Sequence, residues 1–326
     1  MRKNIISILI ISVLIFITFQ ILISSSSILE TVGFSFNIWK TSIFPSLFPF
    51  FVISDILINY GFVEFVGELG KPIMYKLFKT KGESAYVFIM GMISGFPSSA
   101  KYIRELHIKG ILNEKEATKV LTFTHFSNPL FIFGTISTLF LNNKETGLLI
   151  LFIHYCSNVV VGIIFRNLYP SKKENIKFSL KKSIQLMTEK RINNQKSFGL
   201  VISDALINSI NTLLLILGTI TLFLIITTII DNNINLSPYY QAILNGIVEM
   251  TQGLKYISIQ ELPLKIKTII STMFISFGGI SVHMQIISIL SDTKIKYFPF
   301  LLARILHALI SGILIYFSFD FWINIL

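Results

Sequence analysis

Cysteine and charge are scarce in this chain. Cys156 is the single cysteine among 326 residues, so the sequence excludes an intrachain disulfide and a cysteine-based metal cluster. Charged residues make up only 14% of the chain, whereas hydrophobic types make up 52% and Phe alone occurs 30 times. A typical soluble domain carries about 25% charged residues. The composition therefore predicts a polytopic membrane protein.

The sequence also lacks the motifs of nucleotide-driven and hydrolytic enzymes. The Walker A, G-x-G-x-x-G, G-x-S-x-G and HExxH patterns are all absent. The tetrapeptide SSAK at residues 98–101 satisfies the S-x-x-K pattern of penicillin-binding proteins, but no K-T-G follows it. We therefore expect no enzyme activity, no cofactor and no metal. Any uphill transport would depend on an ion gradient, a trapping reaction or another protein.

Seven apolar runs are each about long enough to cross a hydrocarbon core of roughly 30 Å. They cover Ile5–Ile23, Ile43–Ile58, Val120–Leu141, Leu148–Phe165, Leu213–Ile230, Ile266–Leu290 and Tyr297–Phe319. The first run is longer than the core of a signal peptide, and four serines follow it in place of an A-x-A cleavage site. We expect an uncleaved membrane anchor within residues 1–36.

The stretch from Gly91 to Leu106, GMISGFPSSAKYIREL, differs from these runs. Two glycines, one proline and three serines fall between Gly91 and Ser99, so a helix would lose its hydrogen bonds near Gly95-Phe96-Pro97. Backbone freed in this way must be buried in protein or line a polar cavity, because lipid cannot satisfy it. The stretch predicts the re-entrant substrate hairpin of a transporter, with an ordinary cytosolic turn as the alternative.

Polar residues also interrupt two of the apolar runs. Thr124, His125, Ser127 and Asn128 precede a proline in mid-span, where the freed backbone would face whatever lies opposite. A histidine within a span is explained equally well by a hydrogen-bonded core position and by a ligand-binding role. Asp55 lies in the second run and is a functional candidate unless it reaches water at the span end.

The net charge of +11 does not predict nucleic-acid binding, because the basic residues lie between the apolar runs and form no aromatic-interleaved face. If the N-terminus is cytoplasmic, seven crossings place most Lys and Arg on the cytoplasmic side, including Arg304 near a span end. The exceptions are Lys40, Lys144, Lys255, Lys265 and Lys267. Residues 170–198 show no sustained apolar face and predict a basic cytoplasmic linker that can touch anionic lipid.

The sequences before and after this linker resemble each other. GMISGFPSSAKYI, from Gly91, matches GIVEMTQGLKYI, from Gly246, in its glycine, its polar break and its closing KYI. Each half then has an interrupted span, FSNPLFI from Phe126 and FGGISVHMQ from Phe277. We therefore predict two repeats, residues 37–169 and 199–326, each with three crossings and one hairpin. An odd number of crossings inverts the second repeat, so the two hairpin tips would meet near the membrane midplane.

The second break carries an acidic residue. Glu249 precedes Thr251 and Gln252 and would be costly in lipid unless it is paired, protonated or exposed to water. The candidate partners for its carboxylate are Lys101, His125 and His283.

The four motifs, in this order, resemble the sporulation integral membrane protein family YlbJ/SpoVV, whose hairpins belong to the wider nucleoside-recognition gate group. The resemblance runs from about Trp39 to the C-terminus. It implies an all-α polytopic membrane protein like the concentrative nucleoside carriers, with about seven transmembrane helices and two re-entrant hairpins in two inverted gate repeats. The substrate-binding positions that it implies are Ser94, Gly95, Pro97, Ser98, Ser99, Lys101, Ser127, Asn128, Glu249, Thr251, Gln252, Gly278, Gly279, Ser281 and His283.

The family is associated with endospore formation and is thought to move dipicolinic acid out of the mother cell across the outer forespore membrane. Hydroxyl groups, half-helix N-termini and Lys101 suit a flat dianion, and the same groups would hold the hydroxyls of a nucleoside. We expect a transporter of a small anion such as dipicolinate, in the outer forespore membrane or the cell membrane. A nucleoside permease and a non-transporting membrane scaffold are the alternatives. The coupling ion, the direction of transport and homo-oligomerisation stay open.

Overall fold

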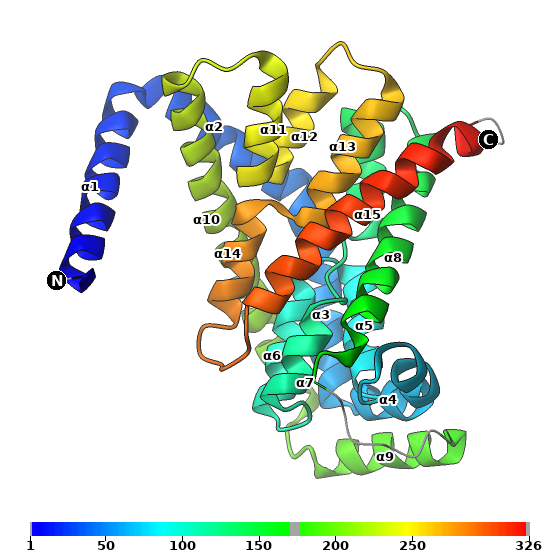
Figure 1. The fold of residues 1–326 in the computed structure, drawn as a ribbon. Helices are drawn as coiled ribbons and strands as arrows, with labels where there is room; N and C mark the ends of the chain where they lie inside the picture. The colour runs from blue at the N-terminus through cyan, green and yellow to red at the C-terminus, as the bar shows by residue number, and fades with distance from the viewer. Residues whose placement is uncertain (1, 170–176, 324–326) are drawn as a thin grey trace.

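The computed structural model describes residues 2–169 and 177–323, and all regular secondary structure within these ranges is helical (Figure 1). Six helical segments of this part are long and apolar enough to cross a membrane. They are Ile5–Ile23, Ser25–Asn59, Glu145–Asn167, Phe198–Asn233, Leu264–Ile289 and Phe298–Ile323. The prediction of an all-α, multi-pass membrane protein is confirmed.

In chain order the helices are α1 (Arg2–Ile23), α2 (Ser25–Ile38), the π-helical turn η1 (Trp39–Ile43), α3 (Phe44–Asn59), α4 (Phe62–Ile73), η2 (Met74–Phe78), α5 (Ser84–Ser94), α6 (Ser98–Ile108), α7 (Glu114–Leu121), the π-helical η3 (Phe131–Phe140), α8 (Glu145–Ile164), η4 (Phe165–Asn167), α9 (Leu180–Asn193), α10 (Phe198–Asn233), α11 (Pro238–Val248), α12 (Met250–Ser258), α13 (Leu264–Phe277), α14 (Gly279–Ile289) and α15 (Phe298–Ile323).

Two of the predicted crossings differ from the observed helices. The run Ile43–Ile58 is the second half of one continuous helix, Ser25–Asn59, which also passes through the domain boundary predicted after residue 36. The run Val120–Leu141 is divided, because α7 ends at Leu121 and η3 begins at Phe131 with non-helical backbone between them. The structure therefore has six candidate spans within its described residues, where we predicted seven.

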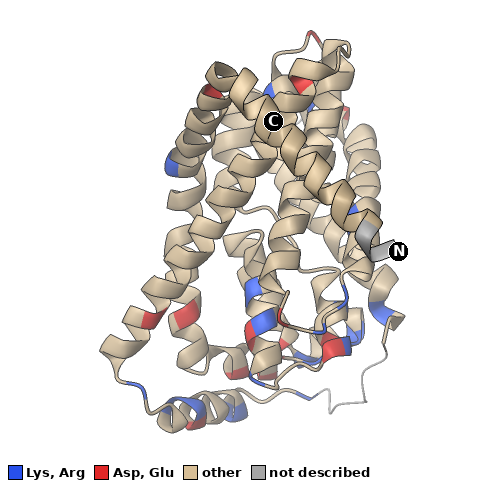
Figure 2. Ribbon diagram, turned by 90° about the vertical axis from the view of Figure 1, so that its left-hand side faces the viewer, with Lys and Arg blue, Asp and Glu red and all other residues tan. Residues whose placement is uncertain are grey.

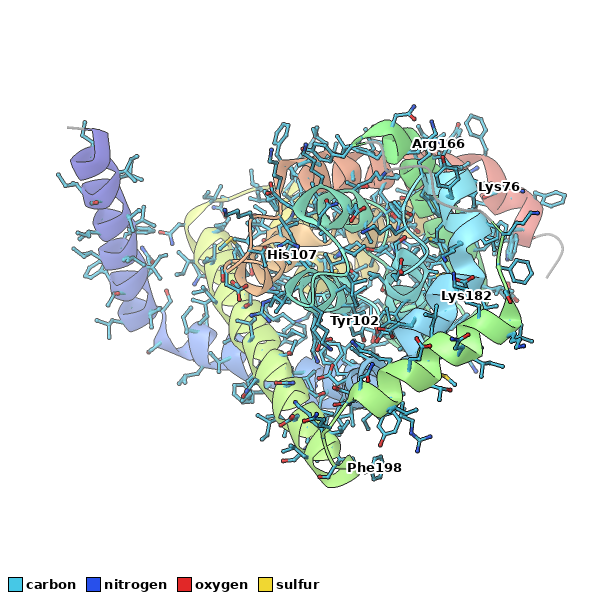
Figure 3. All side chains as sticks on the ribbon, turned by 90° about the horizontal axis from the view of Figure 1, so that it is seen from below. Lys76, Tyr102, His107, Arg166, Lys182 and Phe198 are labelled. Atoms are coloured by element: carbon cyan, nitrogen blue, oxygen red, sulfur yellow. The ribbon has the colours of Figure 1, made fainter. Side chains whose placement is uncertain are left out.

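Helix α10 forms a scaffold with α2 and α3 through polar contacts set in an apolar interface. The Ser35 hydroxyl lies 2.8 Å from the Thr221 hydroxyl, and the Trp39 indole donates to the carbonyl of Leu213 at 3.0 Å. Apolar side chains of both helices surround these contacts. Helix α1 lies apart from the rest of the bundle, has no buried residue within Ile5–Ile23 and presents its apolar surface outward (Figures 1 and 3).

Lys and Arg gather toward the end of the molecule formed by α4, α7 and α9, which we call the basic end (Figure 2). Part of the predicted linker is helical there, because residues 180–193 form α9, which lies beside α4 (Figure 3). Residues 170–176 of the linker lie outside the described part of the chain. Helix α7 begins with a capping box, in which Asn113 and Glu116 each accept from the other's backbone amide.

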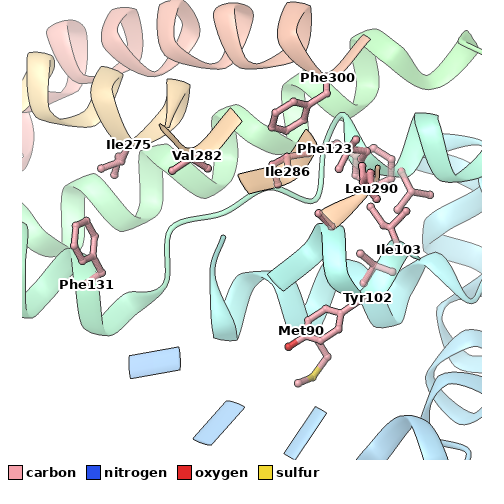
Figure 4. Close-up of a cluster of buried hydrophobic side chains, with 14 of the residues drawn as sticks. Met90, Tyr102, Ile103, Phe123, Phe131, Ile275, Val282, Ile286, Leu290 and Phe300 are labelled. Carbon is pink, nitrogen blue, oxygen red and sulfur yellow. The ribbon is translucent and has the colours of Figure 1, made fainter. Parts of the chain in front are cut away.

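Two helical hairpins extend toward each other from opposite ends of the bundle (Figure 1). Hairpin 1 is α5–α6, with its tip at Gly95–Pro97, and hairpin 2 is α11–α12, with its tip at Glu249. The largest buried apolar cluster packs between these hairpins and the interrupted spans (Figure 4). This core holds the two tips against the two helix breaks.

Candidate substrate-binding site

The tip of hairpin 1 is pressed against the break in the α7–η3 span. Gly95 has φ of +78°, and a Cβ at this position would lie 2.7 Å from the backbone nitrogen of Asn128. Only glycine fits such a conformation and so close an approach. The Asn128 side chain donates to the carbonyl of Ser94 at 3.2 Å and accepts from the amide of Phe131 at 2.7 Å. Asn128 therefore joins the hairpin tip to the start of η3.

Side chains of α8 satisfy much of the non-helical backbone before Asn128. The Asn158 amide donates to the carbonyls of Phe123 and His125, both at 3.0 Å. The imidazole of His154 accepts from the backbone amide of Ser127 at 2.9 Å. Lipid could supply none of these partners, so protein side chains make an open backbone segment tolerable inside the bundle.

Arg304 of α15 binds the same segment from the other side. Its guanidinium donates to the carbonyl of Thr122 at 2.6 Å, to that of His125 at 3.1 Å and to the Asn158 side chain at 2.8 Å. It also contacts the imidazole of His307 at 2.8 Å. The sequence placed Arg304 near a span end, and in the structure its side chain is fully buried against the backbone of the α7–η3 break.

No carboxylate of the described residues forms an ion pair with Arg304. A buried, unpaired cation is costly, and intramembrane charges of this kind mark functional sites. The sequence placed Arg304 in an apolar run but gave no local signal of its partners on α7 and α8.

At the tip of hairpin 2, Glu249 caps α12. Its carboxylate accepts from the amides of Thr251 at 2.7 Å and Gln252 at 3.1 Å, and also from the Thr251 hydroxyl. The Ser281 hydroxyl donates to it from α14 at 3.3 Å. The carboxylate is thus held at the positive ends of two helices. It pairs with none of the cations or histidines that we expected.

The break between α13 and α14 adjoins this tip. Gly278 has φ of +93°, the left-handed conformation that ends α13, and α14 restarts at the next residue. A Cβ on Gly279 would lie 3.0 Å from the amide nitrogen of Met250. The first turn of α14 therefore touches the first turn of α12, which explains how Ser281 reaches Glu249.

One cavity lies where both tips, both breaks and the scaffold meet. The space between these elements amounts to about 450 Å³, open solvent included. Its lining residues are Ile43, Ser46, Leu47, Phe96, Ser127, Asn128, Phe131, Ile216, Ile220, Glu249, Met250, Thr251, Val282 and Gln285. We call this space the tip cavity.

Four predicted site residues line the tip cavity: Ser127, Asn128, Glu249 and Thr251. The remaining predicted residues lie at the hairpin tips and helix breaks without lining it, and these are Ser94, Gly95, Pro97, Ser98, Ser99, Lys101, Gln252, Gly278, Gly279, Ser281 and His283. The apolar wall from α3 and α10 was not predicted, because Ile216 and Ile220 have the same local pattern as lipid-facing residues.

Lys101 and His283 already have protein partners. The Lys101 ammonium lies 2.8 Å from a carboxylate oxygen of Asp55, and 5.1 Å from the ring centre of Phe51. The His283 ring accepts from the Tyr297 hydroxyl at 2.8 Å and donates to the carbonyl of Phe277 at 3.1 Å. Both side chains are therefore engaged in contacts between elements of the bundle.

A second, more polar space lies toward the basic end, and we call it the polar vestibule. It amounts to about 900 Å³, including open solvent, and is lined by Lys101, Arg104, Glu105, Asn208, Asn211, Thr212, Ser288, Ile289, Ser291 and Asp292. Its residues on α10 and α14 continue the faces that line the tip cavity one to two turns away. The vestibule thus approaches the tip cavity from the basic end.

Arg104 and Asp292 lie at the vestibule and connect hairpin 1 to the loop between α14 and α15. The guanidinium contacts both oxygens of the Asp292 carboxylate, one of them at 2.8 Å. This charge-assisted contact lowers the pKa of Asp292 below its usual value. No group of three or more His, Cys, Asp or Glu side chains in the described residues has the geometry of a metal site.

Helical hairpins, two broken spans and a largely apolar cavity between them, in a chain with six candidate spans among its described residues, define a multi-pass membrane protein. The family model Gate, described as nucleoside recognition, matches residues 41–143, which contain hairpin 1 and the first broken span. The chain is also 31% identical over 333 residues to the sporulation integral membrane protein YlbJ of Bacillus subtilis (strain 168), covering 95% of this chain and 82% of that protein. The chain belongs to this family of sporulation integral membrane proteins. No solved structure matches it.

Proposed function

We propose that this chain is a secondary carrier that moves a small aromatic dianion, dipicolinate, across the outer forespore membrane of a sporulating cell. The observation that carries the proposal is the tip cavity, where two hairpin tips and two interrupted spans meet beside a buried cation that has no acidic partner among the described residues. Membership of a sporulation membrane protein family with a gate domain supports the cellular setting.

The electrostatics around the tip cavity favour an anion. Arg304 holds the carbonyls of Thr122 and His125, which lie five and two residues before the cavity-lining Ser127, so its charge lies beside the segment that forms this part of the wall. The first turn of α6, at the tip of hairpin 1, has neither an acidic residue nor a side-chain cap, which leaves its positive end uncompensated. Ser127, Asn128 and Gln285 supply hydrogen-bonding groups for carboxylate oxygens.

A nucleoside permease is the second candidate, and Glu249 favours it. A carboxylate in the cavity wall accepts hydrogen bonds from sugar hydroxyls, whereas it repels a dianion unless it is protonated or already compensated. Here the α12 amides and Ser281 occupy part of its hydrogen-bonding capacity. If dipicolinate is the substrate, the Glu249 carboxylate either carries a proton or keeps its hydrogen bonds with the amides of α12.

The arrangement also supports alternating access. The hairpins point toward each other from opposite ends, and the polar vestibule approaches the tip cavity from the basic end. In the proposed topology the basic end and the N-terminus are cytoplasmic, and the two halves are inverted repeats. Movement of the hairpins would then open the cavity to one side at a time.

Counterflow in proteoliposomes tests the proposal. Vesicles loaded with unlabelled dipicolinate should accumulate labelled dipicolinate, and vesicles loaded with uridine should not accumulate labelled uridine. Uridine counterflow alone would establish the permease in place of our proposal. If both labels stay outside while the protein is folded and inserted, the chain is a scaffold and the proposal fails.

The variant Glu249→Gln separates the two substrates in a binding assay. A nucleoside that depends on the charged acceptor should lose about 1.5–3 kcal/mol of binding, which is roughly tenfold or more in affinity. Dipicolinate binding should persist, and the pH dependence of its transport should disappear if Glu249 carries a proton. A variant unchanged for both ligands would place Glu249 outside the substrate contacts.

A further inference from the structure

His125 is a buried histidine whose ring has no hydrogen-bond partner among the described residues. Its side chain has no solvent exposure, and both ring nitrogens are unpaired. The carbonyl of the same residue is satisfied by Asn158 and Arg304. The fold therefore supplies hydrogen-bond partners for the backbone carbonyl of His125, but the described residues supply none for its ring nitrogens.

The His125 ring lies against three parts of the site, which are the tip of hairpin 1, helix α15 and the α13–α14 break. It stacks on Phe96 of the hairpin 1 tip, with ring centres 4.8 Å apart and an interplanar angle of 11°. Phe300 of α15 packs on it edge-on at 5.2 Å. On the α13–α14 break, a Cβ at Gly278 would lie 3.4 Å from its Nε2 atom. The imidazole thus sits where hairpin 1 meets both interrupted spans.

Burying these two nitrogens unpaired is unfavourable. Each unsatisfied polar atom loses the hydrogen bonds that it would make with water, and an apolar side chain of similar size would avoid that cost. The other histidines near this region use their rings, since His154 binds Ser127 and Ser276 and His307 binds Arg304 and His154. A buried imidazole without hydrogen-bond partners is rare in natural proteins, so we infer that His125 has a role in another conformation of this protein.

Phe96 lies between His125 and the tip cavity. The Phe96 ring stacks on the imidazole and also lines the cavity. Displacement of the hairpin 1 tip would therefore present the flat face of the imidazole to the cavity and let water reach its two unpaired nitrogens. A planar aromatic ring could replace the Phe96 ring on that face, while water hydrogen-bonds with the nitrogens in the plane of the imidazole.

We propose that His125 is a ring-recognition residue: once Phe96 withdraws, its imidazole face stacks on a planar aromatic substrate. This inference rests on the proposed carrier function and sharpens it, because it makes the site selective for aromatic over aliphatic anions. Charged groups near the ring do not favour its protonation, since Arg304 of α15 is close and the neighbouring side chains His154 and His283 are neutral hydrogen-bond acceptors. His125 acts as a neutral imidazole.

The test uses the full-length protein in nanodiscs, with dipicolinate, uridine and the aliphatic dicarboxylate pimelate as probes. His125→Leu should weaken dipicolinate binding about tenfold, while its melting temperature stays equal or rises because two unmet polar atoms are removed. His125→Phe, which keeps a flat ring, should retain more of the affinity. Wild-type protein should prefer dipicolinate to pimelate, and His125→Leu should lose that preference.

A second measurement does not depend on the substrate. Diethyl pyrocarbonate, which modifies accessible neutral imidazoles, should react slowly with His125 in the wild type and faster in Phe96→Ala, with His107 at the basic end as the internal control. Bound dipicolinate should protect His125 in Phe96→Ala.

The outcomes separate the two proposals. If wild-type protein binds none of the probes, the proposed function fails, whatever the modification rate of His125. If dipicolinate binds and His125→Leu binds it as tightly as the wild type, the inference is overturned. The same holds if His125→Leu loses stability together with binding, because the ring is then a packing element, or if Phe96→Ala leaves His125 unreactive.

Discussion

At the scale of single residues, the role of a charged side chain in the site depends on its partners, which its position in the sequence does not reveal. Arg304 and Lys101 are both cations near the tip cavity, and their surroundings differ. Lys101 forms an ion pair with Asp55, so its charge is compensated by the scaffold. Arg304 is fully buried and bound to carbonyls and neutral side chains. Of these two cations, Arg304 is therefore the one whose charge no carboxylate of the described residues compensates.

Arg304→Lys and Arg304→Met separate charge from hydrogen bonding. Lys keeps the charge but cannot hold the Thr122 and His125 carbonyls with a planar fork, so we expect a lower melting temperature with dipicolinate affinity within about threefold. Met loses both, and dipicolinate affinity should fall about tenfold or more while uridine affinity changes little. Equilibrium binding and thermal melting in nanodiscs measure these effects. Equal loss of dipicolinate and uridine binding in Arg304→Met would mean that Arg304 only shapes the segment.

Lys101→Gln tests whether this lysine serves the fold or the substrate. The substitution leaves the buried Asp55 carboxylate unpaired, which costs about 3–5 kcal/mol of stability. The double variant Asp55→Asn/Lys101→Gln should recover most of the melting temperature and the transport rate. Arg104→Gln, which breaks a more exposed pair, is the matched control and should cost no more than about 1 kcal/mol. A stable double variant that still fails to transport would assign Lys101 to the substrate.

At the scale of helices, the sequence predicted the features that depend on local backbone chemistry. The tip at Gly95–Pro97, the break at Gly278 and the capping box at Asn113 and Glu116 follow from residue types that disrupt or cap a helix wherever they occur. The long helix Ser25–Asn59 was not predicted, because four serines resemble a loop and yet are compatible with a helix whose neighbours bury it. Contacts between distant helices, such as Asn158 with Phe123, leave no local signal.

Helix α7 is docked at the basic end by Lys119, which gives the packing of this helix a pH dependence. The Lys119 ammonium donates to the Lys79 carbonyl at 2.5 Å, and burial lowers its pKa to about 8 from its usual 10.5. Because the unfolded chain holds this proton more tightly, the free energy of unfolding should rise with pH between about 8 and 10.5. Melting temperatures in detergent across this range measure it.

Substitution isolates that effect. Lys119→Met should remove the part of the rise between about pH 8 and 10.5 that belongs to this group, whereas Lys115→Met, on the exposed face of the same helix, should leave it unchanged. An identical pH profile in Lys119→Met and wild-type protein would show that another group controls the dependence.

At the scale of the whole molecule, the two sequence segments that we matched as a predicted repeat make similar contacts with the scaffold. Tyr102 and Tyr256 occupy the same position in the matched KYI segments, and each binds the scaffold helix beside its own hairpin. The Tyr102 hydroxyl lies 2.7 Å from the Ser54 hydroxyl on α3, and the Tyr256 hydroxyl donates to Asp231 on α10 at 3.0 Å. These paired contacts support the repeat that the sequence predicted from short motifs, and the opposed hairpins agree with an inverted second copy.

The inverted topology predicts that the basic end and the α8 start lie on opposite sides of the membrane. Lys181 on α9 and Asn142 before α8 are both exposed, and α8 spans the distance between the two ends. Single cysteines at these positions, in a Cys156→Ser background, should react with an impermeant maleimide from opposite faces, with Lys181→Cys labelled from the cytoplasmic side as the positive-inside rule requires. Right-side-out and inside-out vesicles, each with a permeabilised control, give the two readings. Labelling of both positions from one face would contradict the inverted repeat and the alternating access that depends on it. Labelling of Lys181→Cys from the outer face, with Asn142→Cys labelled from the inner face, would reverse the proposed membrane orientation of the chain and leave the repeat intact.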